Sequence, residues 1–301
     1  MIYDCFMFND ELDMLLLRLT YMSKYVDYFV IGESVQTHSN LNKPLFYLDH
    51  IDKFSEFKEK IIHVNIPPVS GLDSWGNEYY QRNYLKEGLK NCKDDDIIII
   101  GDNDEFIDME YLHSKYAITK PTIIEMDLFY YFFNLKTGVK WQWNLITPYS
   151  FIKNVNIGDR ESYFKLDSVT ILKDTTKTLG WHFSYLFGFN IQLYQSKLKS
   201  FSHQEFNTPY FLDAKRIATC LQLGVDFLER NSVYSVVDIK KELPKQLIDA
   251  LIKTSLIENY VYKKPGLPFY LSPYHIKYLI KFKLKPILKS KLVTLNLIHN
   301  D

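Results

Sequence analysis

The sequence predicts an α/β protein with a central, mostly parallel sheet, followed by a mixed β and helical part. Apolar runs alternate with helical patterns through the first hundred residues, which favours parallel strands joined by right-handed crossovers. Residues 97–100 are four consecutive isoleucines, as expected of a strand covered on both faces. Residues 123–151 are instead rich in aromatic and β-branched side chains, which favours antiparallel or mixed sheet.

The first predicted elements are a strand, a helix and a second strand. Residues 2–8 form the first apolar run. Apolar side chains between Leu12 and Met22 then recur at helical spacing and predict a helix with one buried face. Asn9 precedes this helix, and we expect it to be the N-cap. The apolar run 28–31 predicts the next strand.

The later elements follow from the same patterns. Residues 61–66 predict a strand that two prolines close. Residues 76–91 and 210–230 predict helices. Trp141 and Trp143 stand two residues apart, so an extended segment would place them on one face of a strand.

The composition excludes several classes of protein. Lys+Arg and Asp+Glu are both 36, and this zero balance argues against a chain that coats nucleic acid over its whole surface. The cysteines Cys5, Cys92 and Cys220 form no CxxC pair, which excludes a disulfide scaffold and a zinc ribbon. No apolar stretch reaches the ~18–20 residues of a membrane helix, and no signal peptide is visible. We therefore expect a cytoplasmic protein.

The C-terminal part differs in charge from the rest, so we divide the chain into residues 1–235 and a helical, basic extension, 236–301. From His275 onward the one acid is Asp301. The lysines of this segment interleave with apolar residues and are Lys277, Lys281, Lys283, Lys285, Lys289 and Lys291. The extension either packs on the main domain with its lysines in solvent or lies on an anionic membrane surface as a peripheral contact. Pro286 would interrupt a long helix.

The clearest candidate for chemistry follows the isoleucine run, at the carboxyl end of the strand, where ligands bind in open parallel sheets. Asp102 and Asp104 point to the same side of an extended segment and together suit a hard divalent cation. The structural alternative is a turn, or the N-cap of a helix near Asp108. Residues 94–96 carry the same Asp-X-Asp pattern at the other end of the strand, so position rather than pattern singles out the later pair.

Other polar side chains also fall at predicted strand ends or helix starts. Glu33 is placed to reach a ribose or base, and Arg82 to pair with phosphate oxygens. His182 and His203 can bind metal or phosphate, and Glu205 can accept a hydroxyl proton. Each of these residues also has a purely structural interpretation. Glu33 and Glu205 would then be ordinary solvated acids and Arg82 a surface arginine. The two histidines would be part of the core.

The sequence lacks GxSxG, Walker A, GxGxxG and HExxH motifs, which weakens hydrolase, NTPase, dehydrogenase and metalloprotease hypotheses. Two hypotheses for the function of these residues stay open. One is a metal-dependent nucleotidyl- or phosphotransferase that uses the same acids. The other is a non-catalytic carbohydrate-binding module in which Trp141 and Trp143 stack on sugar rings.

Several motifs resemble glycosyltransferase family 17, which includes the enzymes that add bisecting GlcNAc. Residues 3–13 are similar to its opening DxFxFNNELDLL, and residues 27–34 to its VDYFVIVES. Residues 102–105 resemble its DxDE element. Residues 180–184 and 202–205 resemble its GWH.S and SH.E elements. The similarity runs in order over residues 2 to about 210.

The resemblance implies a GT-A-type nucleotide-sugar-binding fold over residues 1–235. It also implies inverting sugar transfer from a nucleotide sugar such as UDP-GlcNAc to a glycan acceptor, with Mn²⁺ or Mg²⁺. The site residues it implies are Asp102, Asp104 and His203 for the metal, Glu33, Arg82, Asp102, Asn103 and His182 for the nucleotide sugar, and Glu205 or else Asp127 as catalytic base. Animal members carry an N-terminal membrane anchor, whereas this chain starts at its first strand, so we expect a microbial or viral surface glycan as acceptor.

Overall fold

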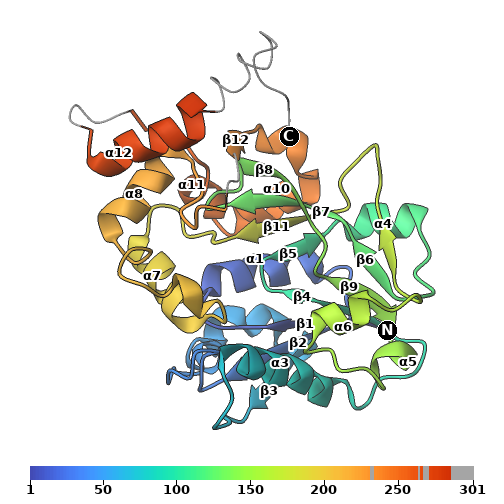
Figure 1. Cartoon of the computed structure of the whole chain (residues 1–301). Helices are drawn as coiled ribbons and strands as arrows, with labels where there is room; N and C mark the ends of the chain where they lie inside the picture. The colour runs from blue at the N-terminus through green and yellow to red at the C-terminus, as the bar shows by residue number, and fades with distance from the viewer. Residues whose placement is uncertain (231–233, 264, 267–270, 286–301) are drawn as a thin grey trace.

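The computed structural model describes residues 1–230, 234–263, 265–266 and 271–285, and these form two sheets with helices around them (Figure 1). The larger sheet has the strand order β10-β6-β9-β4-β1-β2-β3. Its strands are β1 (Ile2–Met7), β2 (Tyr28–Ser34), β3 (Ile61–Ile66), β4 (Ile97–Asp102), β6 (Thr122–Ile124), β9 (Leu145–Pro148) and β10 (Thr170–Leu172).

The larger sheet is mostly parallel, as the alternation of strands and helices predicted. Strand β1 lies between β2 and β4 and is parallel to both, and β3 is parallel to β2. Phe6 stands opposite Ile31 on one side and Gly101 on the other. Strand β9 lies between β4 and β6 and is antiparallel to both, so the sheet as a whole is mixed. The carboxyl ends of β1, β2 and β4 therefore share one edge of the sheet.

The smaller sheet is mixed, which confirms the prediction for the middle of the chain. Its order is β12-β8-β7-β11-β5, with only β7 and β11 parallel. Its strands are β5 (Glu105–Ile107), β7 (Met126–Tyr130), β8 (Leu135–Trp141), β11 (Gly180–Ser184) and β12 (Tyr234–Val236). Trp141 is the last residue of β8, so Trp143 lies beyond the strand. The prediction that the two tryptophans share one face of a strand is therefore wrong.

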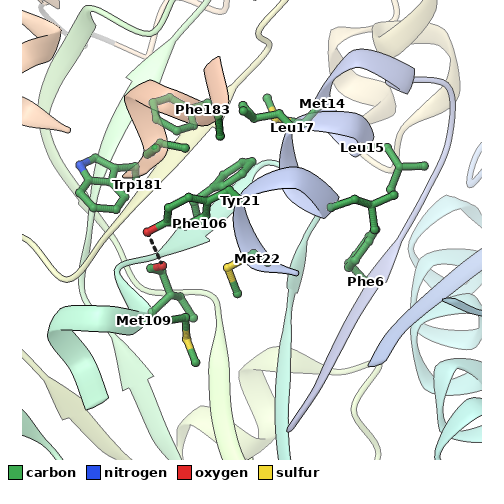
Figure 2. Close-up of a cluster of buried hydrophobic side chains, with 14 of the residues drawn as sticks. Phe6, Met14, Leu15, Leu17, Tyr21, Met22, Phe106, Met109, Trp181 and Phe183 are labelled. Carbon is green, nitrogen blue, oxygen red and sulfur yellow. Dashed lines mark hydrogen bonds between the residues drawn. The ribbon is translucent and has the colours of Figure 1, made fainter. Parts of the chain in front are cut away.

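Helix α1 (Leu12–Met22) lies between the two sheets (Figure 2). Its side chains Met14 and Leu17 point toward Phe183 of β11, and Leu15 packs near Phe6 of β1. The helix begins after Glu11, which makes no side-chain cap, so the prediction that Asn9 is the N-cap is wrong. Contacts with both sheets replace the missing cap, because burial rather than capping provides most helix stability in proteins.

The isoleucine run is covered on both faces, as predicted. Ile99 belongs to the core between the sheets, together with residues of α1. Ile98 and Ile100 point the other way, into a second core with Leu85 and Leu89. Side chains alternate between the faces of a strand, so β4 contributes to two apolar layers at once.

The remaining helices cover the sheets or extend the chain beyond them (Figure 1). They are α2 (Phe46–Asp49), η1 (Ile51–Lys60), α3 (Ser74–Tyr84), η2 (Leu85–Leu89), α4 (Met109–Lys115), α5 (Tyr149–Ile152), α6 (Arg160–Phe164), α7 (Ile191–Ser200), η3 (Gln204–Phe206), α8 (Ala214–Leu223), α9 (Ile239–Glu242), α10 (Lys245–Lys253), α11 (Leu256–Asn259), α12 (Pro273–Tyr278) and η4 (Leu279–Leu284). The helix predicted over residues 76–91 is thus α3 followed by a 3-10 turn, and α8 occupies part of the predicted 210–230.

The C-terminal helices pack on the rest of the protein. Leu247 and Leu251 of α10 are buried in the core that contains α1. Tyr278 is buried in a third core with side chains of α8 and the smaller sheet. Pro286, Lys289 and Lys291 lie outside the described residues. Within the described part of the chain, no helix combines the length and apolar character needed to cross a membrane.

Candidate active site

A cavity of about 350 Å³ opens at the carboxyl ends of β1 and β4. Residues 7–14, which connect β1 to α1, form one wall, and residues 102–104 after β4 form another. Arg82 of α3, Phe183 near the end of β11 and Lys197 of α7 are among the other lining residues. The cavity thus lies where ligands bind in open parallel sheets.

Two arginines bind Asp102, which ends β4. The Nη1 atom of Arg82, on α3, lies 3.0 Å from Asp102 Oδ1. The Nη2 atom of Arg160, the first residue of α6, donates to the same oxygen. Burial alone would raise the pKa of Asp102, but Arg160 and Arg82 hold it well below its usual range. The carboxylate is therefore ionised and oriented before any ligand arrives.

Asp104 is paired with His182 across the two sheets. His182 Nε2, on β11, lies 3.2 Å from Asp104 Oδ1, and the indole of Trp141 packs on the imidazole with ring centroids 4.1 Å apart. Burial opposes both charges, yet each partner favours the charge of the other, so the pKa of His182 is raised and that of Asp104 is lowered. The pair fixes the side chain of Asp104 at the cavity wall.

Glu105 and Asn103 hold polar atoms that have no partner among the described residues. Glu105 Oε1 accepts a hydrogen bond from Trp141 Nε1 at 2.7 Å, whereas its Oε2 accepts none. Burial and the neighbouring Asp102 raise the pKa of Glu105. Both amide atoms of Asn103 are buried without a hydrogen bond, and Asn103 lines the cavity. Buried polar atoms without partners cost free energy, so Asn103 is a strong candidate for a ligand contact.

The structure separates Glu33 and Asp127 from the cavity lining. Glu33 is fully buried, accepts a hydrogen bond from the backbone of Tyr47, and lies 3.4 Å from Lys43 Nζ. Lys43 does line the cavity, so Glu33 positions the Lys43 ammonium group at the cavity wall. Asp127, on β7, is bound by Lys136 and Lys140 on β8 at 2.8 Å and 2.5 Å.

His203 and Glu205 lie next to each other just beyond α7. His203 Nδ1 is 2.7 Å from Glu205 Oε1, and the imidazole packs edge-on against Trp75, with a ring-centroid distance of 4.6 Å. Both side chains are about half exposed, and neither belongs to the lining residues. Ser200 and Phe201, three and two residues before His203, do line the cavity. His203 and Glu205 are thus close to its edge.

A family model for glycosyltransferase family 17 matches residues 1–266 of this chain. The chain belongs to glycosyltransferase family 17. Three curated proteins that resemble this chain are β-1,4-mannosyl-glycoprotein 4-β-N-acetylglucosaminyltransferases. The human and rat proteins are each 31% identical over 106 residues, and the mouse protein is 30% identical over the same length. Each alignment covers 32% of this chain and 20% of the relative, so the match spans about a fifth of the length of these relatives.

The family 17 protein also has cavity residues that sequence analysis missed. Lys197 Nζ lies 2.6 Å from Glu11 Oε1, and both residues line the cavity. Burial alone would lower the pKa of Lys197, but Glu11 and Asp104 raise it well above the usual lysine value. Asp10 lines the same wall, and burial together with Glu11 raises its pKa to about 6. The sequence offered one clue, because Asp10 and Glu11 directly follow the first strand.

The side chains of this family 17 site supply only some of the donor atoms that a divalent cation needs. Asp102 and Asp104 offer hard carboxylate oxygens, and the second oxygen of each makes no hydrogen bond to a described residue. Across the described residues, no three His, Cys, Asp or Glu side chains gather as a metal site. Mg²⁺ often binds through one or two carboxylates together with substrate phosphates and water. The two acids fit a cation that a diphosphate helps to hold.

Proposed function

We propose that this family 17 protein is an inverting glycosyltransferase that moves a sugar, GlcNAc in the simplest case, from a UDP-sugar to a glycan hydroxyl. The observation that supports this best is the cavity at the carboxyl ends of β1 and β4, with Asp102, Asn103 and Asp104 on its wall. The printed name of the relatives describes N-acetylglucosaminyl transfer, which favours GlcNAc as the sugar. The same placement of acids at strand ends favours a GT-A-type fold.

Charged side chains in the cavity match the needs of a departing diphosphate. Lys197 and Lys43 bring ammonium groups to its lining, and Arg82 and Arg160 orient Asp102. A cation at Asp102 and Asp104, Mn²⁺ or Mg²⁺, would supply further neutralisation of the leaving group. Asn103 provides a free amide donor and acceptor for the nucleotide sugar. Fixed charges of this kind stabilise a transition state without reorganisation during the reaction.

Inversion requires a base that takes the proton of the acceptor hydroxyl as it attacks the anomeric carbon. We propose Glu205 for this role, in preference to Asp127. Glu205 is exposed near the cavity edge with His203 beside it. Asp127, in contrast, forms ion pairs with two lysines. Catalytic hydrogen bonds often tighten only when substrate is bound, so the present distance of Glu205 from the cavity is compatible with the role.

The proposal is tested by donor binding and product release together. We expect a UDP-sugar to raise the melting temperature with Mn²⁺ present, since a ligand at ~100 times its Kd stabilises the folded state by ~2.7 kcal/mol. We expect transfer to release UDP. The Asp104→Ala protein should fold, but the UDP-sugar should no longer raise its melting temperature and it should release no UDP. Asp95→Ala is the matched control, because Asp95 is exposed at the opposite end of β4.

The outcomes separate the open alternatives. Release of pyrophosphate from a nucleoside triphosphate would indicate a nucleotidyltransferase. Carbohydrate binding that needs neither nucleotide nor metal would indicate a binding module. Wild-type turnover by a folded Asp104→Ala protein would refute the assignment of this site.

A further inference from the structure

The last described helical segment, α12 with η4, has apolar side chains on two faces. Tyr278 and Phe282 are buried in the core shared with α8. Ile276, Ile280 and Leu284 point away from that core and are 50%, 44% and 52% exposed. These three residues, here called the outer stripe, follow one another at intervals of four. Figure 1 shows α12 at the periphery of the molecule, beside α8.

The outer stripe is unusual because long apolar side chains repeat on it without a partner among the described residues. Scattered exposed apolar residues are normal on proteins, but aligned ones mark interaction sites. The stripe is also held firmly in place. Lys277 and Lys281 each bind Glu229, at 3.0 Å and 3.2 Å, and Tyr278 donates to the same carboxylate. The helix is therefore fixed with its outer face directed to solvent.

The charged residues in the sequence of this C-terminal segment have one sign. Residues 261–300 contain eight lysines and neither Asp nor Glu. Two acids from outside this segment contact α12 and η4: Glu229 binds Lys277 and Lys281, and Asp213 accepts a hydrogen bond from Tyr274. Lys285 is exposed at the end of the described helix. An anionic bilayer presents charge of the opposite sign to the lysines of this segment.

We propose that the outer stripe docks this protein on the surface of an anionic lipid bilayer. The apolar side chains would enter the boundary between headgroups and acyl chains, and exposed lysines of the segment such as Lys285 would contact the lipid phosphates, as in interfacial amphipathic helices. Lysine residues near such a surface each add attraction that salt weakens. This inference rests on α12 and η4 and does not depend on the proposed sugar transfer.

The test is co-sedimentation of the full chain with lipid vesicles. We expect binding to phosphatidylglycerol vesicles, little binding to phosphatidylcholine vesicles, and loss of binding at high salt. Ile280→Glu should weaken binding by roughly tenfold or more, since it removes an apolar side chain that would enter the bilayer and adds a charge that anionic lipids repel. Ile252→Glu is the matched control, because Ile252 on α10 is 58% exposed and outside the outer stripe. It should bind like wild type.

Three results would overturn the proposal. The first is that the wild-type protein does not sediment with phosphatidylglycerol vesicles. The second is equal binding to phosphatidylglycerol and phosphatidylcholine vesicles. The third is that Ile280→Glu and Ile252→Glu change binding equally. Folding is checked by the melting temperature of each variant. Should Ile280→Glu unfold, Leu284→Gln removes apolar surface from the exposed end of the stripe without adding charge, and unchanged binding by this variant would also refute docking. UDP-sugar binding, measured on the same samples without vesicles, shows separately whether the proposed transferase function holds.

Discussion

Arg18 supports the backbone of Asp102: its Nη1 atom lies 3.0 Å from the Asp102 carbonyl oxygen. The same nitrogen donates to the carbonyl of Glu105. The other side of the guanidinium forms a bidentate pair with Asp4 of β1, at 2.8 Å and 2.6 Å, and both side chains are almost fully buried. One arginine of α1 therefore joins β1 to the turn after β4, where the candidate metal-binding acids Asp102 and Asp104 lie.

Replacing Asp4 should destabilise the protein strongly. Asp4→Asn leaves the Arg18 charge buried without its partner, which typically costs about 3–5 kcal/mol. Chemical denaturation measures this loss. Glu56→Gln, which breaks the exposed ion pair with Lys253, is the control and should stay within about 0.5 kcal/mol of wild type. Equal stability of the Asp4→Asn protein would show that the buried pair is not needed.

Gly158→Ala should disturb the position of Arg160. A Cβ atom at Gly158 would overlap the backbone carbonyl of Tyr79, on α3, so the segment before α6 must shift. We expect a loss of about 1–3 kcal/mol in stability, and weaker donor binding because Arg160 binds Asp102. Gly138→Ala is the matched control, since a Cβ there meets no described atom within 4 Å. Similar results for both variants would contradict this explanation.

Asp10→Asn should stabilise the protein at neutral pH. The pKa of Asp10 is raised to about 6 by burial and by Glu11, so its ionised form is disfavoured in the folded state. This cost is absent below the ordinary Asp pKa of about 4, grows as the pH rises and is complete above pH ~6. The variant should gain about 1–3 kcal/mol at pH 8 and nothing at pH 4.

The control for Asp10 is Asp13→Asn. Asp13 is half exposed and pairs with Lys53 at 3.0 Å, so we expect little change in stability at either pH. Melting curves of both variants from pH 4 to pH 8 give the comparison. A gain by Asp10→Asn that is the same at both ends of this range would show that its titration is not the cause.

Glu205→Gln should lower turnover by about 10²–10⁴-fold if Glu205 is the base. Donor binding should remain, because Glu205 does not line the cavity. Asp127→Asn, which tests the second candidate, should affect stability more than turnover since Asp127 is held by Lys136 and Lys140. Single-turnover kinetics with saturating donor separates the chemical step from binding. A larger loss of turnover in Asp127→Asn would reverse the assignment.

Local patterns were sufficient to predict several strands and their environment. The isoleucine run predicted a strand covered on both faces, and β4 is such a strand. The N-cap prediction at Asn9 was wrong because capping propensity is weak beside the burial of α1 between two sheets. The prediction that Trp141 and Trp143 share a strand face was also wrong. Strand β8 ends at Trp141, and periodicity does not show where a strand ends.

The sequence by itself determined that the first strands are parallel, that Asp102 and Asp104 lie at the end of a strand, and that the chain resembles family 17. These follow from short-range periodicity and contiguous motifs. Only the tertiary structure decided which charges meet in the cavity. Glu11 and Lys197 are 186 residues apart in the chain yet form an ion pair, and Arg160 reaches Asp102 across 58 residues. Such pairs depend on how helices pack on the sheets, and no local pattern encodes that distance.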